Sequence, residues 1–178
     1  PFITLPNWVN AAAHCGFNIR PIFDELGIQT DLVNLEDATI SLPLLGQVMD
    51  ACVERSREQH FPFVLGETFA FDYLPDIATF VVTSPTLRQA VRVFDWVRTL
   101  INPMIDVRLE EEGELARLVL VRDQDPAEPE GRVGAYFVES LFAAIIKFGR
   151  AIAADLEADA VLRLRFPEPR YAAVYARS

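Results

Sequence analysis

The composition of this chain excludes several classes of protein. Its net charge of −10 over 178 residues gives a surface poorly suited to bind the phosphates of nucleic acid. A hydrophobic fraction of 51% with 13 phenylalanines can offset the entropy of ordering, which excludes a disordered chain. No apolar run reaches the roughly 18 residues of a membrane span and no signal-peptide pattern begins the chain, so we expect a cytoplasmic protein.

Residues 1–60 have the pattern of a helical subregion. A first helix in PNWVNAAAHCGF ends at Gly16, and a second in RPIFDELGI has Pro21 in its first turn and ends at Gly27. A third begins after Ser41, whose hydroxyl suits an N-cap, and carries apolar residues at helical spacing.

The segment FPFVLGETFAFDYLPDIATFVVTSPT is rich in aromatic residues and follows no single helical period. Pro62, Gly66 and Pro75 interrupt it. The segment is too apolar for an exposed loop, so we expect it to line an interior. That interior is either the core of the domain or a ligand cavity, and the pattern leaves both open.

Residues 83–103, TSPTLRQAVRVFDWVRTLINP, predict one well-defined helix. Ser84 is the expected N-cap and Pro85 the first helical residue. At about 100° per residue, the apolar side chains from Leu87 to Ile101 share one face. Arg98 falls about 20° from Leu87 on this wheel, so its guanidinium is predicted to point inward.

The next segments predict a small sheet between helices. IDVRLEEEGELARLVLVR alternates apolar and charged residues around a turn at Glu112–Gly113, which indicates a β-hairpin. A long helix is expected over 132–156, and AVLRLRF predicts a further strand before a final helix from Glu168.

The predicted fold class is α+β, with a helical N-terminal third and a small antiparallel sheet packed with long helices. The sheet consists of the hairpin and the later strand. We expect a single domain over 1–178, made of the helical subregion 1–60 and an α+β subregion 61–178.

The long helix 132–156 is apolar on two sides. Its narrow polar side is marked by Arg132, Tyr136, Glu139, Lys147 and Arg150. One apolar side carries Val133, Phe137 and Ala144, and the other carries Phe142, Ile146 and Ala153. Because a single core usually covers only one side of a helix that is not central, we expect a homodimer contact through the second set.

The sequence lacks the common catalytic and cofactor-binding motifs. Neither a glycine-rich nucleotide loop nor a GxSxG or HExxH motif is present. His14 and His60 have no cysteine or carboxylate at ligand spacing, so we expect no metal and no cofactor. Cys15 and Cys52 lack CxxC spacing and are expected to be reduced and packed.

Two interpretations remain for Arg98. Its guanidinium could reach solvent from the helix end or pair with a protein carboxylate. Alternatively it binds the carboxylate of an apolar effector at the bottom of an aromatic pocket. The residues predicted to line such a pocket with Arg98 are Phe71, Tyr73, Phe80, Phe94, Tyr136 and Phe137.

Several stretches occur in an order that points to a family. The chain contains CGFNIRPIFDELGI and LEDATISLPLLGQVMDACVE, then YLPDIATFVVTSPTLRQAVRVFDWVRTLINP, then VRLEEEGELARLVL and a terminal LRFPEPRYAAVY. This order resembles the N-terminal effector-sensing domain, of the "arabinose-binding" type, of AraC/XylS-family transcription regulators. The resemblance covers nearly the whole chain, SPTLRQA is its most specific piece, and its label does not identify the effector.

The resemblance implies a bacterial one-component regulator. This part would bind a small effector and help to dimerise, and a helix-turn-helix region C-terminal to Ser178 would bind DNA. A start at Pro1 without Met, and an ending that has the pattern of an unfinished helix, agree with a piece of a longer protein. We expect residues 1–178 alone not to bind duplex DNA specifically. An acidic surface cannot displace the counterions of DNA, and their release supplies much of the affinity of DNA-binding proteins.

The family has no shared catalytic residues, so the resemblance implies that the chain is not an enzyme. Two alternatives stay open beside the sensor. One is a pure dimerisation module with a filled core. The other is a small enzyme with an acid/base pair formed by Asp72 and Glu67.

Overall fold

The computed structural model describes residues 2, 4–29, 39–56, 58–71, 74–100, 106–121, 129–152, 163 and 171–177. Most of these residues are helical, and they also include one antiparallel sheet of two strands. The predicted α+β class is therefore confirmed. The chain divides into two compact units, which we describe separately. The single domain over 1–178, with its subregions 1–60 and 61–178, stays a prediction.

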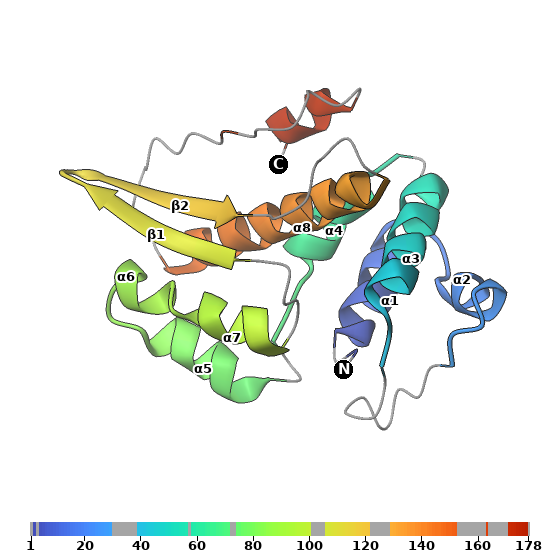
Figure 1. The fold of residues 1–178 in the computed structure, drawn as a ribbon, viewed down its shortest axis with the longest axis horizontal. Coiled ribbons are helices and arrows are strands. Elements are labelled where there is room, and N and C mark those ends of the chain that lie inside the picture. Colours follow the sequence, from blue (N-terminus) through green and yellow to red (C-terminus); the bar gives the residue numbers. More distant parts are fainter. Residues whose placement is uncertain are drawn as a thin grey trace. The chain divides into compact units, whose positions relative to one another are not determined.

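The helical unit comprises residues 7–29, 41–69 and 125–178, and the hairpin unit comprises residues 1–6, 30–40 and 70–124. The elements of the helical unit are α1 (Leu5–His14, except its first two residues), α2 (Arg20–Glu25), α3 (Leu42–Arg55), α4 (Phe61–Glu67), α8 (Pro129–Ile152) and the 3-10 helix η1 (Ala172–Arg177) (Figure 1). Those of the hairpin unit are α5 (Pro75–Thr83), α6 (Leu87–Ala90), α7 (Val93–Leu100), β1 (Asp106–Glu112) and β2 (Leu115–Val121).

The predicted boundaries of the N-terminal helices are confirmed. Beyond the end of α1, Gly16 adopts a φ of +78°, and Phe17 N donates to Ala12 O at 3.0 Å. This pattern is a Schellman motif, which glycine permits because it has no Cβ. At the start of α3, Ser41 Oγ accepts from Leu44 N, as an N-cap does.

Helix α4 forms the centre of the helical unit. Every residue from Phe61 to Gly66 is buried, and α4 lies along α8, with α3 packing on both. Trp8 of α1 adds its ring to Phe61 and Phe137, at centroid distances of 5.7 Å and 6.1 Å. For this part of the aromatic segment, the core interpretation is therefore confirmed.

The contact between α4 and α8 depends on Gly66. A Cβ at this position would lie 2.1 Å from Ser140 O and 2.6 Å from Ala143 Cβ. Both distances are far below van der Waals contact, and one neighbour is the backbone of α8 itself. The two helices can therefore approach this closely only with glycine at position 66.

The predicted single helix over 83–103 is wrong. Ser84 ends α5 instead of starting a helix, and its Oγ donates to Phe80 O at 2.6 Å. Its backbone is extended, with φ −64° and ψ 121°, as expected for a residue that precedes a proline. Helix α6 starts at Leu87, and a turn at 91–92 separates it from α7.

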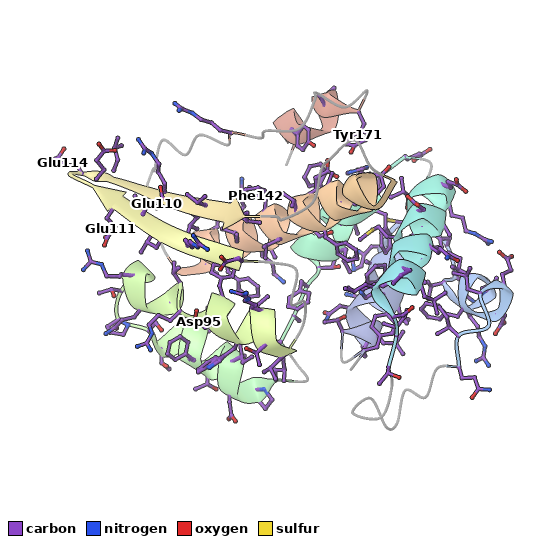
Figure 2. All side chains as sticks on the ribbon, in the orientation of Figure 1. Asp95, Glu110, Glu111, Glu114, Phe142 and Tyr171 are labelled. Carbon is purple, nitrogen blue, oxygen red and sulfur yellow. The ribbon has the colours of Figure 1, made fainter. Side chains whose placement is uncertain are left out.

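The predicted β-hairpin is confirmed. Strands β1 and β2 pair antiparallel, with Glu112 opposite Leu115, and Gly113 takes the turn with a φ of +62°. Helix α7 packs on β1, and α5 packs on α6 and α7. Figure 2 shows Glu110, Glu111 and Glu114 along the tip of this hairpin, where their side chains are exposed.

Three C-terminal predictions are only partly covered by the described residues. Helix α8 spans Pro129–Ile152, and residues 153–156 of the predicted helix lie outside the description. The predicted strand AVLRLRF lies outside it except for Arg163. The final predicted helix is represented by the 3-10 helix η1. No helix among the described residues combines the length and the apolar character needed to cross a bilayer.

We predict that Gly66→Ala destabilises the helical unit. The added methyl group meets the backbone of α8, so the helices must separate, at a cost of about 1–3 kcal/mol or more. Gly149→Ala is the matched control, because a Cβ on this residue of α8 has no neighbour within 4 Å. The control should keep or raise the stability by up to about 1 kcal/mol. Urea denaturation measures both, and equal stability of Gly66→Ala and the wild type would contradict the packing described.

Candidate functional site

A buried carboxylate lies in the middle of α8. The Glu139 side chain is only 1% exposed, and the sequence places this residue on the narrow polar side of the long helix. Its Oε2 lies 2.6 Å from Nε2 of His60, and its Oε1 accepts hydrogen bonds from the hydroxyls of Tyr171, at 2.9 Å, and Tyr175. These three groups, rather than water, therefore solvate the carboxylate.

Three segments of the helical unit supply these groups. His60 immediately precedes α4, and its carbonyl accepts from Phe63 N and Val64 N, so the residue is held at the start of that helix. Tyr175 belongs to η1, and Tyr171 precedes η1 directly. Figure 2 shows Tyr171 where this C-terminal segment passes near α8. The carboxylate thus joins α4, α8 and the C-terminal segment.

Aromatic rings enclose the polar groups. The His60 ring stacks on Tyr171, with centroids 4.1 Å apart and planes inclined by 28°. It meets Phe63 and Tyr136 edge-on at 5.1 Å and 5.8 Å, and Phe63 meets Tyr175 edge-on at 5.1 Å. We call His60, Phe63, Tyr136, Glu139, Tyr171 and Tyr175 the Glu139 cluster.

The two phenols of the cluster keep their protons. Burial raises the pKa of Tyr171 well above its usual value, and the negative charge and hydrogen bond of Glu139 raise it further. Burial and the hydrogen bond to Glu139 raise the pKa of Tyr175 in the same way. Both hydroxyls therefore keep the hydrogen that they donate to the Glu139 carboxylate at neutral pH.

The arrangement combines a hydrogen-bonded carboxylate with aromatic rings. Glu139 accepts hydrogen bonds, and the His60 ring offers a flat surface beside it. Together they fit a hydroxyl group carried on an aromatic ring. A serine or cysteine nucleophile is not among the groups that bond to His60 or Glu139 in the described residues.

The prediction that Arg98 points inward is wrong. Its side chain is 58% exposed and pairs with Asp106 at the start of β1, at 3.5 Å. The cause is the break between α6 and α7, which resets the helical phase. In α7 the buried residues are Val93 and Val97, and Arg98 lies about 100° beyond Val97. The inward guanidinium that motivated a carboxylate-bearing effector is thus absent, although no observation tests ligand contact by Arg98 itself.

The structure distributes the other predicted pocket residues over both units. Phe71, Phe80 and Phe94 belong to the hairpin unit, where Phe80 meets Trp96 edge-on at 4.8 Å. Tyr136 and Phe137 lie on α8 in the helical unit, Tyr136 in the Glu139 cluster and Phe137 against Trp8. Tyr73 lies outside the described residues. Ligand contact by these residues stays a prediction.

No sequence pattern predicts the pair of His60 and Glu139. The two residues are 79 positions apart, so no local spacing could reveal them. A glutamate in the middle of a largely apolar helix was the available signal. Within the described ranges, no three His, Cys, Asp or Glu side chains gather in a way that could hold a metal ion. The alternative acid/base residue Asp72 lies outside these ranges.

Both cysteines carry free thiols, as predicted. Cys52 is buried in α3 and Cys15 is half-buried after α1. Burial raises the pKa of both thiols, which keeps them protonated and unreactive at neutral pH.

We predict that removing both phenols weakens the dependence of stability on alkaline pH. In the wild type, the unfolded tyrosines ionise near their usual pKa of about 10, whereas the folded Tyr171 and Tyr175 stay protonated. The free energy of unfolding therefore falls as the pH rises above about 10. The Tyr171→Phe/Tyr175→Phe double variant should fall less steeply in urea denaturation at several pH values.

The matched control for this comparison is Ser140→Ala. Ser140 is the buried neighbour of Glu139, and its hydroxyl has no hydrogen-bond partner among the described residues. The Ser140→Ala variant should show the same decrease of the free energy of unfolding with pH as the wild type. Parallel pH profiles of the double variant and the wild type would show that the phenols are not held by Glu139.

Comparison with known proteins assigns the chain to a family. A family model described as the arabinose-binding domain of AraC transcription regulators, N-terminal, matches residues 16–178. No curated protein and no solved structure matches the chain. The match covers nearly all of the sequence, including α2 to η1 and every residue of the Glu139 cluster. The chain therefore belongs to the family of N-terminal arabinose-binding domains of AraC transcription regulators, which are ligand-sensing regulatory domains.

Proposed function

We propose that this chain senses a small, largely apolar effector for a one-component transcription regulator in the bacterial cytoplasm. The observation that carries the proposal is the family match over residues 16–178. The DNA-binding helix-turn-helix region is expected C-terminal to Ser178. The net charge of −10 agrees with a regulator in which this part binds the effector and another region contacts DNA.

The Glu139 cluster transmits ligand binding from the sensing domain to that region in this proposal. Tyr171 and Tyr175 lie in the last described segment of the chain, and their hydroxyls bind the carboxylate of α8. The His60 ring extends the same contact to α4. A ligand that changes these bonds would therefore change how the C-terminal segment is held, and with it the start of the region that follows.

The rings near Glu139 bear on the character of the effector. Three aromatic rings pack around the His60 ring that contacts Glu139, which favours a ligand with an apolar body. The carboxylate-bearing effector predicted from Arg98 remains a prediction, but its motive is weaker because that arginine is exposed and paired with Asp106.

We also propose a homodimer through α8. Ile146 is 38% exposed, and Phe142, which Figure 2 labels, is half-buried. The two are four residues apart and form an apolar strip on the helix. The third predicted residue, Ala153, lies outside the described residues.

We predict that a small-molecule library contains compounds that raise the melting temperature of residues 1–178. A ligand at about 100 times its Kd adds about 2.7 kcal/mol of stability. In a chain of this size each kcal/mol shifts Tm by roughly 2–4 °C. Calorimetry should then give one site per chain. A stable dimer to which no compound binds would favour the alternative of a dimerisation module with a filled core.

We predict that Ile146→Glu converts the dimer to a monomer. The substitution places a charge in the proposed apolar contact, where it would lose its hydration. Light scattering after gel filtration at tens of micromolar measures the mass. Leu115→Glu is the control, because Leu115 is 64% exposed on β2 and not part of the contact. A wild type that is already monomeric, or an Ile146→Glu variant that stays dimeric, would contradict the proposal.

A further inference from the structure

The Tyr171 side chain is bound as a ligand would be. Its ring stacks on the imidazole of His60 at 4.1 Å, and its hydroxyl donates to Glu139 at 2.9 Å. The ring centroid of Tyr136 lies 6.5 Å from that of Tyr171. The surroundings thus recognise both parts of a phenol, namely the flat ring and the acidic hydroxyl hydrogen.

We propose that the Glu139 cluster is the effector site, that its ligand is a hydroxylated aromatic compound, and that this ligand binds by displacing the phenol of Tyr171. The inference rests on the proposed sensing function and names the ligand class and the regulated contact. Tyr171 then acts as a tethered substitute for the effector. Its displacement removes one of the two tyrosine hydrogen bonds that hold the C-terminal segment on α8, and this weaker attachment is the signal to the region that follows.

The two sides of the contact differ in how firmly they are held. His60 and Glu139 have side chains that are 6% and 1% exposed, and they belong to the packed pair α4 and α8. Tyr171 is only half-buried and precedes a short 3-10 helix. Because 3-10 helices have weaker hydrogen-bond geometry than the packed helices α4 and α8, the tyrosine is the side that moves.

The charge of the site selects among ligands. A carboxylate-bearing ligand would bring a second negative charge to the buried Glu139, which is unfavourable where water is excluded. A ring without a hydroxyl would stack on His60 but leave the carboxylate without one of its donors. A phenol replaces both the stacking and the hydrogen bond that Tyr171 provides.

Competition by Tyr171 gives the proposal a sharp test. The tethered phenol is present at a high effective concentration, so it lowers the apparent affinity for a free one. We expect p-cresol, which is the tyrosine side chain itself, to bind Tyr171→Ala about tenfold or more tightly than the wild type. Isothermal titration calorimetry on residues 1–178 measures this. Toluene and benzoate, which lack the hydroxyl or add a charge, should not show the gain.

Further variants make the result unambiguous. Tyr171→Phe keeps the ring and serves if Tyr171→Ala folds poorly, and its affinity for p-cresol should lie between those of the wild type and Tyr171→Ala. Adding Glu139→Gln to either variant should remove the gain, whereas adding Ser140→Ala should not.

Unchanged p-cresol affinity in both Tyr171 variants would overturn the inference, as would a gain that persists with Glu139→Gln. If the library of the previous section still yields a ligand, the sensing function stands and only its placement at Tyr171 fails. If the library yields no ligand but Tyr171→Ala binds p-cresol through Glu139, the recognition of a phenol by the Glu139 cluster is supported and the sensing function is not.

Discussion

The Glu139 carboxylate is almost completely removed from water, and a charge in such a place is costly unless donors surround it. The donors come from His60 before α4 and from Tyr171 and Tyr175 near the end of the described chain. Satisfying one side chain therefore requires three segments, far apart in sequence, to meet at a single point. The helical unit is arranged around this requirement, and removing any donor leaves a partly unsatisfied buried carboxylate.

Apolar packing sets the positions that this polar contact needs. Helix α4 is buried from Phe61 to Gly66, and the glycine allows it to lie directly on the backbone of α8. His60 is thereby brought to Glu139. The hairpin unit differs, because its ion pairs, such as Arg88 with Glu111, are exposed and contribute little stability. A specific buried polar network is thus found in the helical unit. We assign to this network the proposed response of the C-terminal segment to the ligand.

The sequence was informative where structure depends on neighbouring residues. The end of α1 at Gly16, the N-cap Ser41 and the hairpin turn at Gly113 follow from local backbone chemistry. Arg98 does not point inward because the turn at 91–92 interrupts the single helical period that its prediction assumes from Leu87 to Ile101. The contact of His60 with Glu139 could not be predicted, since only tertiary packing brings together residues 79 positions apart.

Hydrogen–deuterium exchange tests most directly whether Glu139 holds the C-terminal segment. Glu139→Leu keeps a similar volume in the core and removes the acceptor for both tyrosines, while the apolar packing of α4 on α8 is kept. We expect amide hydrogens of residues 171–177 to exchange faster in this variant than in the wild type, whereas those of α1 and α3 should not change. Equal exchange of residues 171–177 in the two proteins would contradict the central role given to this carboxylate.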